Sequence, residues 1–383
     1  MKLIYLDNNA TTRVLPQVME AMHPWFSEQF GNPSSSHPMG QYAKQAVMTA
    51  RKAVANFLHA GPADIVFTSG ATESIQTAII SALAANPERR RIVTSTVEHA
   101  STLLLLNHLA ETQGIEVVLV PVLNNGQLDM AALGAAVTPT TALVTLLHAN
   151  NETGVIFPVA EAASIAHAQG ALFHIDAAQS AGKIPLDVTN LGCDLLSFSG
   201  HKLHAPKGVG VLYVRKGIAL QPLILGHQER NRRGGTENLT GIVGLDIACH
   251  LAQQCLTSER TSIASLRDRL EQGILKRLPF ARVNGSGPRV PNTTNICFPE
   301  LLGEEMLHRL GQAGVMASQG SACKASGTEP SHVLLAMGLN RNNALSSLRF
   351  SLSRETTEAE IDSVIETIAA IAKHVLPEAL EAA

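Results

Sequence analysis

The stretch Leu195-Leu196-Ser197-Phe198-Ser199-Gly200-His201-Lys202 decides the fold, because a mostly apolar run passes into small polar residues and then into a lysine. A short apolar run that ends in small residues is typical of a buried strand. Ligands of open α/β sheets bind beyond the carboxyl ends of the strands. Lys202 therefore stands where an amine could form a Schiff base with an aldehyde cofactor, although a lone lysine after a strand is more often a surface residue.

The same pattern recurs along residues 60–215, where short apolar runs alternate with segments of helical spacing at 72–85, 99–112 and 159–168. Repeated units of this kind predict an α/β fold with a mostly parallel sheet and helices on both faces. A further strand is expected at 208–214, with an antiparallel direction as the candidate. The other expected strands are 65–67, 91–93, 117–120, 142–146, 171–175 and 195–198.

The length of 383 residues exceeds the size at which single cores usually stop growing, so we expect two domains. Segment 237–278 has the pattern of one long helix or two. Beyond it, short strand-like pieces and helices predict a smaller α/β domain. We predict a large domain at 13–255 and a small domain made of 1–12 and 256–383, which carries a Gly/Ser-rich loop at about 318–330.

Composition argues against several classes of protein. Apolar residues make up 45% of the chain and the net charge is −3, so neither disorder nor direct nucleic-acid binding is expected. No apolar run approaches the roughly 18–20 residues of a membrane span, and the N-terminus turns polar too early for a signal peptide. We therefore expect a cytoplasmic protein. The five cysteines form no zinc spacing or disulfide framework, which leaves a single reactive thiol as an open question.

A second strand end carries an aspartate, in His174-Ile175-Asp176-Ala177-Ala178-Gln179. An aspartate there can pair with a protonated pyridine nitrogen and make the ring a better electron sink. Gln179 could reach the phenolic oxygen of the same ring. The alternative for Asp176 is a helix N-cap. Asp176 and Lys202 together at the ends of neighbouring strands are harder to explain as caps.

Two more strand ends continue in Thr68-Ser69-Gly70-Ala71-Thr72-Glu73-Ser74 and in Val97-Glu98-His99-Ala100-Ser101. The first begins a helix whose N–H groups could hold a phosphate, although an ordinary capped helix start has the same composition. In the second, His99 could stack on a cofactor ring and move protons. A lone histidine is more often structural.

These segments, taken with five others, resemble the cysteine desulfurases of the class V aminotransferase family, in the longer-loop branch that includes nitrogenase-type and housekeeping enzymes. The resemblance runs from about residue 3 to 370, with the motifs in the family's order. It implies the fold of type I pyridoxal-phosphate (PLP) enzymes. The other five motifs are Tyr5–Thr12, Gly31–Ser35, Asn150–Gly154, Arg232–Asn238 and Ser321-Ala322-Cys323.

The resemblance also implies roles for single residues. Lys202 resembles the lysine that bonds to PLP, Asp176 the partner of its ring nitrogen, and His99 the stacking imidazole. Gln179 resembles the residue that bonds the phenolic oxygen. Phosphate ligands are implied at Ala71, Thr72, Ser199 and His201, and at Thr236 from a second subunit, hence a homodimer. Asn151 and Arg349 match the groups that hold the substrate carboxylate.

Cys323 lies among small residues, with glycines on both sides, which suits an exposed loop. The other cysteines, at 193, 249, 255 and 297, have apolar or helical surroundings that favour inert packing. Lys324 is adjacent in sequence and could favour the thiolate of Cys323. No resident metal is expected, although Cys323 is also a candidate for transient ligation of an iron–sulfur cluster.

The implied reaction takes sulfur from L-cysteine, leaves L-alanine and holds the sulfur as a persulfide on Cys323. An acceptor protein would then receive it for iron–sulfur cluster assembly or for another thiolation pathway such as DNA phosphorothioation. The nearest alternatives are a selenocysteine lyase or an aminotransferase of the same fold. A catalytically silent relay protein is a third, against which Lys202, Asp176, His99 and Cys323 all count.

Overall fold

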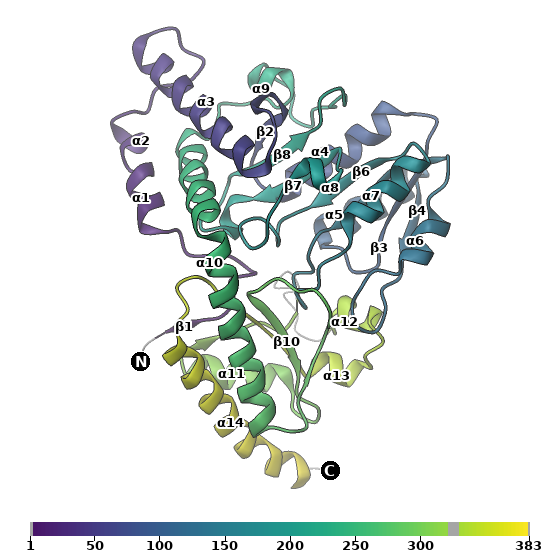
Figure 1. The fold of residues 1–383 in the computed structure, drawn as a ribbon, viewed down its shortest axis with the longest axis vertical. Coiled ribbons are helices and arrows are strands. Elements are labelled where there is room, and N and C mark those ends of the chain that lie inside the picture. Colours follow the sequence, from purple (N-terminus) through teal and green to yellow (C-terminus); the bar gives the residue numbers. More distant parts are fainter. Residues whose placement is uncertain (1–2, 321–328, 382–383) are drawn as a thin grey trace.

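The computed structural model describes residues 3–320 and 329–381, and a seven-stranded sheet is its centre (Figure 1). The strand order is β2-β8-β7-β6-β5-β3-β4. Strand β8 is antiparallel to both of its neighbours, and the remaining neighbouring pairs are parallel. The expected α/β fold is therefore confirmed. The strands are β2 (Ile65–Thr68), β3 (Arg91–Ser95), β4 (Glu116–Val120), β5 (Thr141–Leu147), β6 (Leu172–Asp176), β7 (Leu195–Ser199) and β8 (Gly210–Val214).

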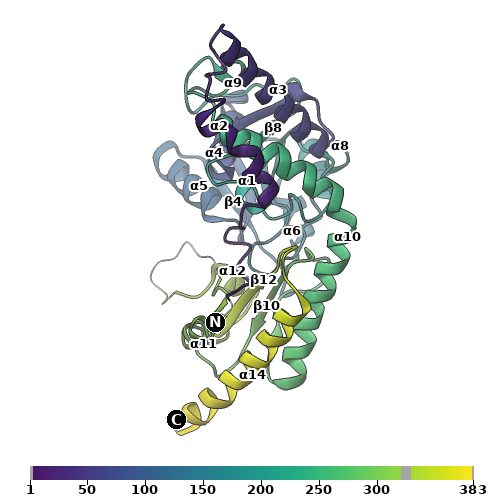
Figure 2. The same ribbon diagram turned by 90° about the vertical axis from the view of Figure 1, so that its left-hand side faces the viewer.

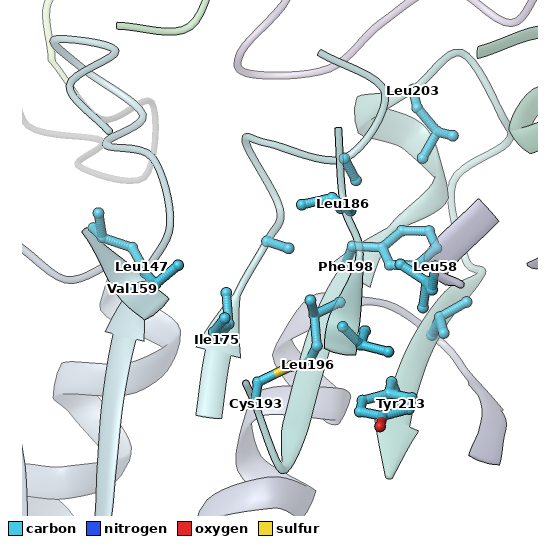
Figure 3. Packing of buried hydrophobic residues seen from close by; sticks show 14 of the residues in the cluster. Leu58, Leu147, Val159, Ile175, Leu186, Cys193, Leu196, Phe198, Leu203 and Tyr213 are labelled. Atoms are coloured by element: carbon cyan, nitrogen blue, oxygen red, sulfur yellow. The ribbon is translucent and has the colours of Figure 1, made fainter. Parts of the chain in front are cut away.

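Apolar side chains on both faces explain why the central strands appear as continuous apolar runs in the sequence. Neighbouring residues of one strand enter different clusters: Ile92 packs with α4 and α5, and Val93 packs on the opposite face. Figure 3 shows part of the larger cluster, with Leu196 and Phe198 of β7 in it. The helices of this part are α1 (Pro16–Met22), α2 (Pro24–Ser27), α3 (Pro38–Leu58), α4 (Ala71–Ala85), α5 (Ala100–Gln113), α6 (Met130–Ala136), α7 (Val159–Ala168), α8 (Val188–Leu191) and α9 (Gln228–Asn231).

The C-terminal part has its own buried cluster, which includes Leu6, Phe298 and Phe350. Its three-stranded sheet has the order β12-β10-β9, and the first strand of the chain pairs with β11. The segment after β1 leaves this part and reaches the large sheet, where Thr12 donates to the carbonyl of His201 just beyond β7. The elements are β1 (Ile4–Tyr5), β9 (Arg282–Val283), β10 (Thr293–Cys297), β11 (Val315–Met316), β12 (Ser347–Ser351), α11 (Gly303–Gln312), α12 (His332–Ala336), α13 (Arg341–Leu345) and α14 (Glu358–Glu381).

Helix α10 (Leu239–Arg277) is one continuous helix of 39 residues that joins the two parts (Figures 1 and 2). This helix is continuous at residue 255, where the sequence predicts the boundary between the two domains. The domain boundary remains a prediction. The first half of α10, Leu239–Ser258, is long and apolar enough to span a membrane by length and composition alone. That half also supplies Leu245, Ala248 and Ala252 to the main buried cluster. Such burial is what a core helix of a folded domain requires.

Candidate active site

One cavity of about 440 Å³ lies at the carboxyl ends of the parallel strands. This is where an open α/β sheet offers a binding site, because loops diverge there and leave space between them. Nine of the residues singled out in the sequence line it, although they come from segments far apart in the chain. They are Ala71, Thr72, His99, Asn151, Asp176, Gln179, Ser199, His201 and Lys202.

Lys202 ends a single 3₁₀ turn, Gly200–Lys202, that follows β7 directly. Its Nζ donates to the carbonyl oxygens of Asn9, at 2.5 Å, and Ala10, at 2.9 Å. The N-terminal segment is fixed beside it because both the amide and the hydroxyl of Thr12 donate to the carbonyl of His201. The amine is thus anchored by neutral oxygens at the cavity wall.

Asp176 ends β6 with only 6% of its surface exposed. Burial raises the pKa of its carboxyl group, while the Ala178 N–H, which donates to Oδ1 at 2.9 Å, and the nearby His99 and Lys202 act in the opposite direction. A buried carboxylate of this kind needs a positive partner in the cavity. A protonated ring nitrogen would be one.

His99 stands just before α5 and caps that helix. The Ser101 N–H donates to its Nδ1 at 3.1 Å, so Nδ1 is an acceptor and the proton of the neutral ring is on Nε2. Burial lowers the pKa of His99, and Asp176 opposes this shift. The imidazole is therefore held neutral in one tautomer, ready to donate or accept a proton.

The start of α4 forms the anion-binding end of the cavity. Its N-cap, Gly70, has no side chain, so the first N–H groups of a 15-residue helix open toward the cavity. The loop packs closely on β8, because a Cβ on Gly210 would lie 2.5 Å from the Cα of Gly70. Burial lowers the pKa of the nearby His201 to about 4, which leaves that imidazole neutral. A phosphate would be held here mainly by N–H and O–H donors.

Arg349 lies on β12 and is 1% exposed, but it is not among the residues that line the cavity. Its Nη2 donates to Asp7 Oδ1 at 2.7 Å, and its Nη1 donates to the carbonyl of Asn151 at 3.1 Å. Within the described residues its Nε has no partner, although it is buried. The guanidinium thus adjoins the cavity through Asn151, and the carboxylate-binding role of both residues stays a prediction.

Besides Arg349, two predicted residues lie away from the cavity wall or outside the described part of the chain. Thr236 is exposed and lines a smaller neighbouring hollow with Ser69 and Arg233. Its role toward a second subunit remains a prediction. Cys323 belongs to residues 321–328, which lie outside the described residues.

Three of the thiols that the structure describes are poor nucleophiles. Burial raises the pKa of Cys193 to about 12, and it also raises the pKa of Cys249 and of Cys297. A buried thiol in apolar surroundings is seldom ionised and therefore reacts slowly. Cys255 is half-buried on α10.

Sequence reasoning missed three residues that do not line the cavity themselves but lie next to residues that do. Asn9 accepts on its backbone carbonyl from Lys202 and donates with its side chain to Asn151 and Thr293. Glu98 is fully buried and accepts from the hydroxyl of Ser95 and the amide of Leu147, and burial raises its pKa to about 8. The third missed residue is Lys183, whose Nζ donates to Gln179 and to Asn9. Asn9 and Glu98 stood inside quoted motifs, but neither spacing nor composition showed that they would be buried.

The residues of the cavity fit PLP. The groups that line the cavity are an amine, a buried carboxylate, a neutral imidazole and the start of a long helix. These match, in turn, the aldehyde, the ring nitrogen, the ring face and the phosphate of that cofactor. The volume is within the range of small-ligand sites, about 300–1,000 Å³.

Comparisons with known proteins agree with this chemistry. The family model for class V aminotransferases matches residues 4–364. A protein of Trichormus azollae described as a cysteine desulfurase is 50% identical over 370 residues, which cover 96% of this chain and 92% of that protein.

Two solved structures extend the likeness to the fold. One, described as a NifS-like protein, has a TM-score of 0.92 at 36% identity and covers 97% of this chain and 100% of its own. The other, described as SspA in complex with cysteine, has a TM-score of 0.80 at 36% identity and covers 91% of this chain and 98% of its own.

Proposed function

Since the chain belongs to the class V aminotransferase family and is a PLP-dependent cysteine desulfurase, we propose that this cavity carries the reaction and that Cys323 receives the sulfur. The observation that carries the assignment is that Lys202, Asp176 and His99 line the same cavity as the start of α4. L-cysteine and the thiol of Cys323 are converted into L-alanine and a persulfide.

Each residue has a task that its surroundings permit. When bound, PLP supplies an aldehyde that takes up the amino group of cysteine and a ring that withdraws electrons from its Cα. Asp176 holds the proton of the ring nitrogen. The Nζ of Lys202 takes the Cα proton, because Lys202 lines the cavity and the carbonyls of Asn9 and Ala10 hold its amine there.

Sulfur transfer requires a thiolate that is free to approach. The thiolate of Cys323 attacks the sulfur of cysteine and forms the S–S bond. The Cβ–S bond breaks, and its electron pair stays on Cβ, which takes a proton and becomes the methyl group of alanine. The imidazole of His99 is the proposed donor of a proton in this step. The exclusion of Cys193, Cys249 and Cys297 by burial supports Cys323 as the carrier.

The proposed function is tested with purified protein, PLP and L-cysteine, without any keto acid. We expect L-alanine to form together with one equivalent of protein-bound sulfur, and sulfide to follow when a reducing thiol is added. An aminotransferase would make no alanine under these conditions. L-selenocysteine in parallel separates the lyase alternative, which would show a much higher kcat/KM for selenium and little turnover of cysteine.

We further propose that the enzyme is a cytoplasmic homodimer and that the persulfide passes to an acceptor protein. The exposed position of Thr236 beside the start of α4 is compatible with a second subunit that uses it for the phosphate. Sedimentation of the PLP-bound protein tests the dimer, and Thr236→Val should weaken PLP binding only if the residue serves the phosphate. The acceptor is identified by capture on the persulfide-loaded enzyme.

A further inference from the structure

A second lysine, Lys183, contacts Gln179 of the cavity wall but does not line the cavity itself. Its Nζ lies 2.6 Å from Oε1 of Gln179 and 2.9 Å from Oδ1 of Asn9. Gln179 lines the cavity and is 7% exposed, and Asn9 holds the amine of Lys202 through its carbonyl. Lys183 therefore contacts both groups that shape this side of the site. The reaction described above gives it no task.

Two hydrogen bonds, one to Asn9 and one from Lys183, show which way the Gln179 amide faces. Nε2 of Gln179 lies 3.0 Å from the carbonyl oxygen of Asn9, and a carbonyl can only accept, so the amide nitrogen must be on that side. Oε1 is then the atom that faces Lys183, which donates to it. One hydrogen of Nε2 is committed to Asn9, and the second remains for an acceptor in the cavity.

Asn9 is oriented in the same manner. Its Nδ2 donates to the carbonyl of Asn151 at 3.0 Å, so its Oδ1 must face Lys183. Lys183 thus makes two donated bonds to two fixed acceptors. A neutral amine has two N–H groups, which suffice for both.

The electrostatic surroundings are consistent with a neutral amine. Burial lowers the pKa of Lys183 well below its usual value, and the positive charges of Lys202 and Arg349 add to this. A neutral Lys183 would keep both hydrogen bonds without placing a further ammonium group beside Lys202.

We propose that Lys183 is a positioning residue for the cofactor: its bonds to Gln179 and Asn9 present the amide N–H of Gln179 to the phenolic oxygen of bound PLP. The inference rests on the proposed function, because it takes PLP as the ligand of the cavity. It adds a residue that touches neither the cofactor nor cysteine and acts through Gln179.

The test measures PLP binding and the absorption maximum of the bound cofactor, both without substrate. Lys183→Met should raise the Kd of PLP about 3- to 10-fold, the usual effect of one lost hydrogen bond. It should also displace the absorption maximum in the same direction as Gln179→Ala does. The double variant should be displaced no further than Gln179→Ala alone, since both changes remove the same contact. Lys216→Met, an exposed lysine after β8, is the matched control and should leave both quantities unchanged.

A merely structural Lys183 would lower the melting temperature of Lys183→Met but leave the absorption maximum at the wild-type position, and that result overturns the proposal. If Lys183→Met does not fold, Gln179→Glu replaces the test, because its carboxylate still accepts from Lys183 but offers the cavity no N–H. An unchanged maximum in Gln179→Glu also overturns the proposal. Wild-type protein without any visible band after addition of PLP would instead refute the proposed function.

Discussion

Two regions beside the cavity, the end of the large sheet and strand β12, hold their charged groups in different ways. On the side of the large sheet, Lys202 donates to backbone carbonyls, and Glu98 accepts from a hydroxyl and a backbone amide. On the side of β12, Arg349 forms an ion pair with Asp7 at 2.7 Å. These hydrogen bonds of Lys202 and Glu98 go to uncharged groups, whereas Arg349 also pairs with an opposite charge.

This difference in bonding partners indicates which groups can change protonation during a reaction. A charge that is buried among neutral partners loses hydration without full compensation, so its neutral form gains. A guanidinium keeps its proton and its charge, and the carboxylate of Asp7 balances it. His99, Asp176 and Glu98, whose pKa values burial shifts, are therefore suited to changing protonation, and Arg349 beside β12 to holding a substrate or the structure in place.

The largest effect is expected for Lys202→Ala. Without its amine, turnover of L-cysteine should fall about a thousandfold or more, because both the bond to the cofactor and the Cα base are lost. The visible absorption band of PLP on the protein should vanish as well. Lys216→Ala serves as the control with one fewer exposed lysine. Retention of the band with full turnover would remove Lys202 from the reaction.

A smaller effect is expected for Arg349→Lys. The lysine keeps a positive charge beside Asp7 but lacks the planar guanidinium, which can donate two parallel hydrogen bonds to a carboxylate. If Arg349 holds the substrate carboxylate, KM for L-cysteine should rise about tenfold or more while kcat changes little. Steady-state kinetics and thermal unfolding of the same preparation separate the two roles. A lower melting temperature with an unchanged KM would mean that the ion pair with Asp7 is the whole function of Arg349.

The last effect concerns stability, leaves turnover aside and comes from Glu98. Burial raises its folded-state pKa to about 8, above the ordinary value of 4.5. The folded protein therefore binds more protons than the unfolded chain in this range, and the stability that Glu98 contributes is lost as the pH rises toward 8. Between pH 6.5 and 8 this loss amounts to about 2 kcal/mol.

Glu98→Gln has no such titration, so its free energy of unfolding should fall less steeply than that of the wild type over the same interval. The comparison uses urea unfolding at pH 6.5 and pH 8. Glu98 is fully buried, and the substitution keeps an acceptor for the Leu147 amide. Equal pH dependence in the two proteins would show that Glu98 is ionised throughout.

The fold and one side of the site were predictable because they depend on local patterns. Short apolar runs located the strands, and polar residues just beyond them, such as Asp176 and Lys202, had to meet at one edge of a parallel sheet. The branch of the family and the roles of single residues came from resemblance, and those roles remain predictions.

The contacts that hold the site residues in place, such as those of Lys183 and Arg349, were not predictable from local patterns. Lys183 meets Asn9 across 174 positions of the chain, and Arg349 meets Asp7 across 342. Such contacts depend on how the C-terminal part and the first strand dock on the large sheet, which no local spacing encodes. For this reason the ion pair of Arg349 emerged only from the structure.

The central claim is tested most directly by a single turnover of PLP-loaded protein with L-cysteine, in which alanine and the mass of the peptide around residue 323 are measured together. The account predicts one alanine for each peptide that becomes heavier by one sulfur atom, and neither product from Cys323→Ser. Alanine formed by Cys323→Ser at the wild-type rate, or the sulfur on another cysteine, would contradict it.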